Sequence, residues 1–121
     1  MMEVLDSADD LVAIRVSGKV EKEEWETVTS AVSAALSRHE HISMFMNLAD
    51  LDAISAGAIV EDMKFALKSL GSLDQFKKAA VVADAGWLER LTQLSGKLLP
   101  EMETHVFSTG EEQEALRWAA A

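Results

Sequence analysis

The chain has 121 residues, of which 49% are hydrophobic and 26% charged, a size and composition typical of one folded domain with one core. Its formal net charge of −10 at pH 7 argues against a nucleic-acid partner, which would need a basic face. There is no cysteine, so disulfides and thiolate metal sites are excluded and a reducing compartment is indicated. Residues 1–6 lack the pattern of a signal peptide, and no apolar run reaches the ~20 residues of a membrane-spanning helix. We therefore expect a cytoplasmic protein.

The N-terminal third predicts a hairpin followed by a helix. A short strand starts at Val4, Asp9-Asp10 makes a turn, and residues 11–16 alternate as a strand with one well-buried face. A helix is expected over residues 21–38, because glutamates crowd its first turns, where the helix dipole favours negative charge. Its buried stripe, at helical spacing, is predicted to be Trp25, Val28, Thr29, Val32 and Leu36.

Two buried strands and two further helices are predicted next. Residues 42–48 form a nearly continuous apolar run, typical of a strand covered on both faces. After a loop over 49–54, Ser55 is expected to cap a helix that reaches about Leu70. Residues 78–83 predict another buried strand, and an amphipathic helix is expected to start near Gly86.

The C-terminal part predicts a last strand over 103–107 and a last helix after a capping box made by Ser108 and Glu111. The element order is β-β-α-β-α-β-α-β-α. This order predicts an α/β fold with a five-stranded, mixed, mostly parallel sheet, four helices and right-handed crossovers. No linker interrupts it, so residues 1–121 are expected to form a single domain.

Few residues have the spacing of a catalytic site. His39 and His41 point apart at the end of a helix, so they do not predict a metal site. Asp50 and Asp52 follow a central strand, where α/β proteins place ligands, but turn formation and helix capping also explain them. The chain has no nucleophile elbow, Walker loop or dinucleotide fingerprint. We expect no enzyme activity, cofactor or metal.

Phe65 is an aromatic residue on a polar helix face, between Glu61, Asp62 and Lys68. Either another segment of the chain covers it, or it lines an apolar pocket or a dimer contact. From Lys64 to Lys97 six basic residues stand against three acidic ones, which suits either ordinary solvated helices or an anionic headgroup. Residues 94–100 are similarly open to two interpretations, a packed last helical turn or a mobile flap.

The leading hypothesis is a non-enzymatic module that binds a hydrophobic, lipid-like and perhaps anionic ligand between the helix over 55–70 and the helix after Trp87. The predicted ligand-binding residues are Met63, Lys64, Phe65, Lys68, Trp87, Leu91, Leu94 and Leu98. Contact with a membrane surface fits the same hypothesis. Core packing is the alternative for Met63, Leu91 and Leu94.

An ordered set of segments resembles the SpoIIAA-like family of small bacterial proteins. The segments are Gly18-Lys19-Val20 before Glu24-Trp25, then residues 61–68, Ala80–Asp84 before Trp87, Val106-Phe107 and Ala115–Trp118. The resemblance implies a variant of the STAS domain, a fold that is also compared with the lipid-binding CRAL-TRIO (Sec14-type) domain.

The resemblance also implies an alternative function, a protein-interaction regulatory module of the anti-sigma-factor-antagonist type. In those antagonists a loop of the type Asp-Ser-Ser-Gly carries a phosphorylated second serine at a helix N-terminus. The matching stretch here is Ile54-Ser55-Ala56-Gly57, so the phosphoacceptor position is an alanine. The predicted interaction loop comprises Asp50, Asp52, Ser55 and Gly57. Self-association as a homodimer through an exposed helix face is also expected.

Overall fold

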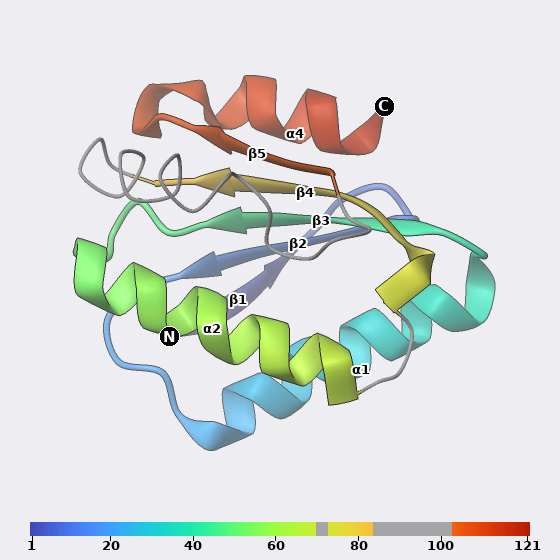
Figure 1. The fold of residues 1–121 in the computed structure, drawn as a ribbon, viewed down its shortest axis with the longest axis horizontal. Helices are drawn as coiled ribbons and strands as arrows, with labels where there is room; N and C mark the ends of the chain where they lie inside the picture. The colour runs from blue at the N-terminus through green and yellow to red at the C-terminus, as the bar shows by residue number, and fades with distance from the viewer. Residues whose placement is uncertain (70–72, 84–102) are drawn as a thin grey trace.

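The computed structural model describes residues 1–69, 73–83 and 103–121 of the chain (Figure 1). Five strands form one sheet in the order β1-β2-β3-β4-β5. Their bounds are β1 Met2–Leu5, β2 Leu11–Val16, β3 Ile42–Asn47, β4 Phe76–Val82 and β5 Glu103–Phe107. β1 pairs antiparallel with β2, and the other neighbours pair in parallel. The predicted mixed, mostly parallel five-stranded sheet is confirmed.

Helices cover both faces of this sheet. The helices are α1 Lys22–Arg38, α2 Ala53–Ser69 and α4 Glu112–Ala120, with short 3-10 turns η1 Leu73–Gln75 and η2 Thr109–Glu111. α1 and α2 lie on one face, and α4 lies alone among the described helices on the other (Figure 1). The helix expected to start near Gly86 lies outside the described residues.

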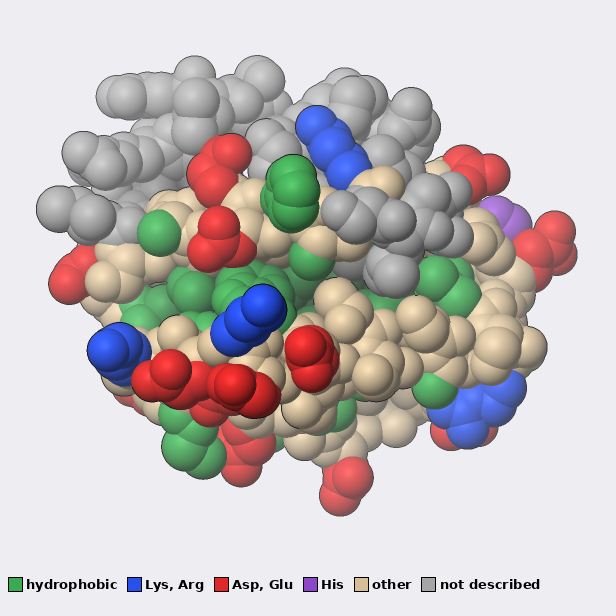
Figure 2. All heavy atoms as spheres, turned by 90° about the horizontal axis from the view of Figure 1, so that it is seen from below, with side chains coloured by type: hydrophobic (Ala, Val, Ile, Leu, Met, Phe, Trp, Pro, Cys, Tyr) green, Lys and Arg blue, Asp and Glu red, His purple; other side chains and the backbone are tan. Residues whose placement is uncertain are grey.

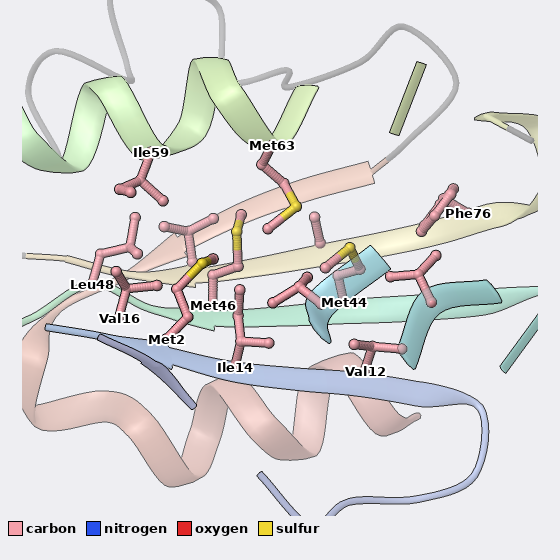
Figure 3. Packing of buried hydrophobic residues seen from close by; sticks show 14 of the residues in the cluster. Met2, Val12, Ile14, Val16, Met44, Met46, Leu48, Ile59, Met63 and Phe76 are labelled. Atoms are coloured by element: carbon pink, nitrogen blue, oxygen red, sulfur yellow. The ribbon is translucent and has the colours of Figure 1, made fainter. Parts of the chain in front are cut away.

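The larger core fills the space between the sheet and the pair α1 and α2 (Figure 3). Ile14 of β2 and Met46 of β3 project from neighbouring strands and are almost wholly buried. Met63 of α2 packs onto these side chains, and Val28 and Val32 of α1 complete the same core. Each such side chain contributes about 1.5–3 kcal/mol by leaving water. The stripe predicted for α1 is therefore confirmed at these two valines, with Trp25 and Leu36 packed at its margin.

The second core lies under α4 and extends one prediction. Leu11 and Ala13 of β2, Phe45 of β3 and Ala80 of β4 pack there against α4. The sequence predicts one well-buried face for β2, and the structure buries the other face as well, where Leu11 and Ala13 are 5% and 0% exposed. Both faces are buried because α4, more than 90 residues away in sequence, crosses the sheet on the far side.

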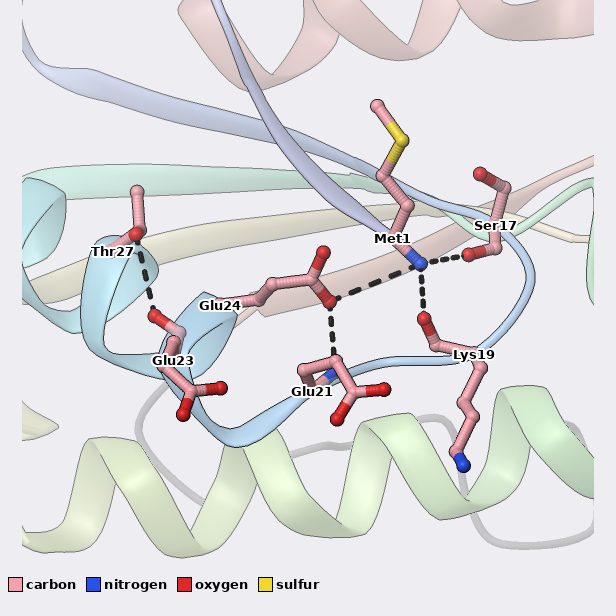
Figure 4. A network of polar contacts seen from close by, with 7 residues as sticks. All are labelled: Met1, Ser17, Lys19, Glu21, Glu23, Glu24 and Thr27. Atoms are coloured by element: carbon pink, nitrogen blue, oxygen red, sulfur yellow. Dashed lines mark hydrogen bonds and ion pairs between the residues drawn. The ribbon is translucent and has the colours of Figure 1, made fainter.

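At the start of α1 and in the turn before α4, carboxylates accept backbone N–H groups. At the start of α1 the Glu21 N–H donates to the Glu24 carboxylate at 2.9 Å, and the amino group of Met1 contacts the same carboxylate at 3.9 Å (Figure 4). The predicted capping box before α4 is confirmed, since the Ser108 N–H and hydroxyl both donate to Glu111 at 2.8 Å. These bonds satisfy donors that a helix start leaves unpaired.

The Glu111 cap predicts a dependence of stability on pH. Donation from the Ser108 N–H and hydroxyl holds the pKa of Glu111 below its ordinary value of 4.5. A carboxyl whose pKa is lowered by folding stabilises the fold fully above its unfolded-state pKa, and this contribution is lost as pH falls through the native pKa. Glu111→Gln should therefore differ most from the parent chain at neutral pH and least at about pH 3. Urea unfolding at both pH values measures this, with Glu40→Gln as control. A constant difference at both pH values would contradict it.

Candidate functional site

The loop between β3 and α2 is held in one shape by hydrogen bonds to the Asn47 side chain, to the backbone of β4 and within the loop itself. Asn47 at the end of β3 is 8% exposed, and its Oδ1 accepts the Ala49 N–H at 3.0 Å. The Leu48 N–H donates to the Val82 carbonyl of β4 at 2.8 Å, and the Leu51 N–H donates back to the Leu48 carbonyl at 3.1 Å. The Leu51 side chain is buried in the larger core. The loop is thus a fixed turn that presents Asp50 to solvent.

Asp52 caps α2, which corrects the prediction for Ser55. The Asp52 Oδ1 accepts the Ser55 N–H at 2.7 Å, and the helix begins at Ala53, inside the stretch expected to be a loop. Asp and Ser are both favoured at the N-cap. Asp52 is the N-cap here, because it directly precedes the helix and its carboxylate accepts the N–H of Ser55 three residues later. Its negative charge lies at the positive end of the helix dipole, which stabilises the helix start.

The four residues predicted for an interaction loop come together at this place. Asp50 and Asp52 are exposed, and Ser55 and Gly57, in the first turns of α2, are partly buried. They lie where the chain leaves the carboxyl end of β3. In open α/β sheets, ligands bind outside the carboxyl ends of the strands.

Acidic side chains gather along the same edge from three helix starts. α1, α2 and α4 follow the carboxyl ends of β2, β3 and β5, which all point the same way (Figure 1). The exposed acidic residues there are Glu21, Glu23, Glu26, Asp50, Asp52, Glu111 and Glu114, beside the exposed Lys19 and Lys22. Arg15 Nη2 contacts Glu112 Oε1 at 3.0 Å and ties β2 to α4 at this edge. The edge therefore carries net negative charge.

Of the residues predicted for a lipid-like ligand, the described part of the chain shows Met63, Phe65 and Lys68, and these three do not share one face of α2. Met63 is 2% exposed and belongs to the core, as the core-packing alternative expects. Phe65 is 75% exposed, so most of its side chain lies in solvent. Lys68 is exposed on the same helix, and Lys64 lies directly before Phe65 in sequence. Trp87, Leu91, Leu94 and Leu98, and the flap proposed for residues 94–100, lie outside the described residues.

A cavity of about 240 Å³ lies at the opposite edge, between the β1–β2 loop and the second half of α1. Asp6, Ser7 and Asp9 line it from the loop, and Ala34 and Arg38 line it from α1. Its mixed charges and open position do not match an apolar ligand site. It was not predicted, because the residues that form it show no motif.

Sequence reasoning also missed a cluster on the α4 side. His105 of β5 stacks on Trp118 of α4, with ring centroids 4.3 Å apart. Lys78 of β4 places its Nζ 4.9 Å from the Trp118 ring centroid and donates to the carbonyls of Trp118 and Ala121. A lysine that binds the last carbonyls of a helix stabilises its end, so this cluster anchors α4 on the sheet.

The described residues contain no metal-binding group of three or more His, Asp or Glu side chains. His39 instead ends α1, where its N–H donates to the Ala35 carbonyl at 2.9 Å. Within the same described ranges, no helix has the length and hydropathy to cross a membrane.

Comparison with known proteins agrees with this architecture. The structure of the anti-sigma factor antagonist SpoIIAA in its unphosphorylated form is similar, with a TM-score of 0.50 and 17% sequence identity over 98% of this chain and 97% of that one. At that identity the likeness shows the fold, and it gives no support to the CRAL-TRIO comparison. A search among curated proteins found no match. The sequence model of the SpoIIAA-like family matches residues 11–120, so the chain belongs to the SpoIIAA-like family.

Proposed function

We propose that this protein is a non-enzymatic regulatory module that binds a partner protein, in the manner of an anti-sigma-factor antagonist. The observation that carries the proposal is the geometry at the start of α2. There the Asp50–Gly57 segment is fixed by Asn47 and by the Asp52 cap and is presented at the carboxyl edge of the sheet. A preorganised exposed loop loses little entropy on binding. The solved structure that shares the fold is itself named as an antagonist.

The proposed module works without a phosphoserine switch at this position. The stretch 54–57 lies in the first turns of α2, where the family resemblance places the phosphoacceptor, and that position is Ala56. The carboxylate of Asp52 already supplies negative charge at the helix start. Partner binding should therefore not depend on modification of Ser55.

The acidic edge indicates the chemistry of the partner. A surface that carries Asp50, Asp52 and the glutamates at the starts of α1 and α4 attracts a basic face. We infer a partner protein that presents lysine or arginine side chains. A lipid ligand draws less support, since Met63 is a core residue and the described cavity is lined by Asp6, Asp9 and Arg38.

The test compares two charge reversals of equal size. Asp50→Arg changes the proposed edge, and Glu40→Arg changes an exposed acidic residue at the opposite edge. The tagged chain is used to capture its partner from cells, and binding of the purified partner is then titrated calorimetrically. Asp50→Arg should weaken binding by about tenfold or more, while Glu40→Arg stays within about threefold. Ser55→Ala should bind as the parent chain does.

Two results would overturn the proposal. Equal effects of Asp50→Arg and Glu40→Arg would mean that the edge has no special role. Loss of binding by Ser55→Ala would mean that the serine, through its hydroxyl or its modification, is required. Binding should also weaken as salt rises from about 50 to 300 mM, because exposed charge pairs are screened over this range.

A further inference from the structure

The cavity between the β1–β2 loop and α1, which we call the Arg38 cavity, is a concave site that the proposed function leaves unused. It lies at the end of the sheet where β2 and β3 begin, opposite the Asp50–Gly57 segment (Figure 1). Its volume is about 240 Å³, below the range of about 300–1,000 Å³ for sites that hold drug-sized ligands. The space therefore suits a smaller molecule, of the size of an amino acid.

The β1–β2 loop forms one wall of this cavity and is fixed by hydrogen bonds. The Ser7 hydroxyl donates to the Leu11 carbonyl at 2.5 Å, and the Leu11 N–H donates to the Ala8 carbonyl at 3.0 Å. The Ser43 N–H of β3 donates to the Asp10 carbonyl at 2.9 Å and ties the loop to the sheet. Because the loop is held in one shape before a ligand binds, binding loses little conformational entropy.

The second half of α1 forms the opposite wall. Ala31, Ala34 and Ala35 line the cavity there, and their spacing of three and four residues puts them on one face of the helix. Val12 of β2, which is 5% exposed, lines the cavity as well. Elsewhere on the face that α1 and α2 cover, hydrophobic side chains and charged ones of both signs project from the surface (Figure 2). The short alanine side chains leave an open hollow with an apolar surface, which a small aliphatic group can cover.

Charged side chains of both signs also line the cavity. Asp6 and Asp9 come from the loop, and Arg38 comes from the last turn of α1. Across the described ranges of the chain, none of these three side chains forms an ion pair or a hydrogen bond with another residue. The guanidinium and the carboxylates thus line one cavity without neutralising each other. A ligand that carries one negative and one positive group can pair with both.

We propose that the Arg38 cavity binds a small zwitterion of the class of a free amino acid with an aliphatic side chain. The ligand carboxylate pairs with the Arg38 guanidinium, whose forked N–H groups match a carboxylate. The ligand ammonium pairs with Asp6 and Asp9, and the aliphatic side chain lies on the alanines of α1. A simple anion would meet two carboxylates and a simple amine would meet the guanidinium, so the cavity selects a ligand that carries both charges.

The exposure of the three charged residues sets the strength of binding. Asp6, Asp9 and Arg38 are all exposed, so water and salt screen their attraction to the ligand. For a ligand of amino-acid size the Kd is therefore on the order of 0.1–1 mM. The inference goes beyond the proposed function, because the cavity lies at the other end of the sheet from the Asp50–Gly57 segment and needs no partner protein.

The first test measures the binding of L-leucine and of two analogues that each lack one charge. The purified protein is titrated with up to about 20 mM ligand, and its backbone amide signals are followed by NMR. L-Leucine should shift the signals of residues 6–12 and 31–38 with a Kd below about 2 mM. 4-Methylpentanoate lacks the ammonium group and 3-methylbutylamine lacks the carboxylate, so each should bind at least about tenfold more weakly. Absence of saturable shifts with L-leucine, or an analogue that binds as tightly, overturns the proposal.

The second test removes each sign of charge separately. Arg38→Gln should weaken L-leucine binding by about fivefold or more, and the double variant Asp6→Asn/Asp9→Asn should do the same. Arg117→Gln removes an exposed arginine from the last turn of α4 and should leave the Kd within about twofold. Because all four side chains are exposed, the variants should keep the fold, which circular dichroism checks. An Arg38→Gln variant that binds L-leucine as tightly as the parent chain would contradict the proposal.

A third test fills the cavity. Ala34→Met places a longer side chain in it, and Ser33→Met adds the same side chain at the neighbouring exposed position of α1, which does not line the cavity. Ala34→Met should weaken L-leucine binding by about tenfold or more, while Ser33→Met should stay within about twofold of the parent. Equal Kd values for the two variants would place the ligand outside the cavity and overturn the proposal, whatever the Asp50→Arg experiment shows for the partner.

Discussion

Phe45→Ala is expected to lower the free energy of unfolding by about 3–5 kcal/mol, which is a large part of the 5–15 kcal/mol typical of a domain. Phe45 lies on the central strand β3, is 0% exposed, and packs on the α4 side against Ala80 and Ala115. Its neighbours include small side chains on a strand and a helix that are held by backbone bonds, so they cannot fill the space that the ring leaves. The loss therefore includes both the transfer of the ring and the cost of a cavity. Urea unfolding followed by circular dichroism measures it.

Phe65→Ala is the matched control for this prediction, because it removes the same atoms at a site that is 75% exposed. It should lower the free energy of unfolding by about 1 kcal/mol or less, because most of the ring already lies in water in the folded state. The contrast between the two phenylalanines tests the placement of α4 and of α2 together. A loss below about 1.5 kcal/mol for Phe45→Ala would mean that α4 does not close this core.

The fold was predictable because its signals are local. The parallel strands were recognised from continuous apolar runs such as 42–48, which need cover on both faces. The helix over 22–38 was recognised from its apolar spacing, and the last helix from the Ser108 and Glu111 pair, which lie three residues apart. The spacing of apolar residues and the residues of a helix cap depend only on positions a few residues apart in the sequence. They can therefore be recognised without the tertiary structure.

The site was less predictable because it depends on contacts between distant segments. Asp52 and Ser55 are both residue types favoured at the N-cap. Asp52 has this role because the helical backbone begins at Ala53, which only the structure shows. Whether Phe65 is covered depends on which other segments pack over α2. The sequence of α2 itself does not predict this. Asn47 lies within the apolar run 42–48, but an Asn near the end of such a run is a turn signal that the sequence does offer.

Asn47→Leu is expected to affect both stability and partner binding, because the buried amide of Asn47 is one of the groups that fix the interaction loop. The substitution removes the Oδ1 acceptor and leaves the Ala49 N–H without this bond in a partly buried position. An unsatisfied buried donor costs about 1–3 kcal/mol, so the free energy of unfolding should fall by this amount. The loop over 48–52 loses its fixed turn, and partner affinity should fall by about tenfold or more, as ordering then occurs on binding.

Met46→Leu, one residue earlier on the same strand, separates this effect from a general loss of packing. Met46 is 1% exposed and faces the α1 and α2 side, and a change between similar volumes should cost less than about 1.5 kcal/mol. It should leave partner affinity unchanged, because the bond from Ala49 to Asn47 is kept. If Asn47→Leu lowers stability but not affinity, the partner binds elsewhere on the domain. If it lowers neither, the turn is held by the Leu48–Val82 and Leu51–Leu48 backbone bonds alone, and the side chain of Asn47 only occupies space beneath it.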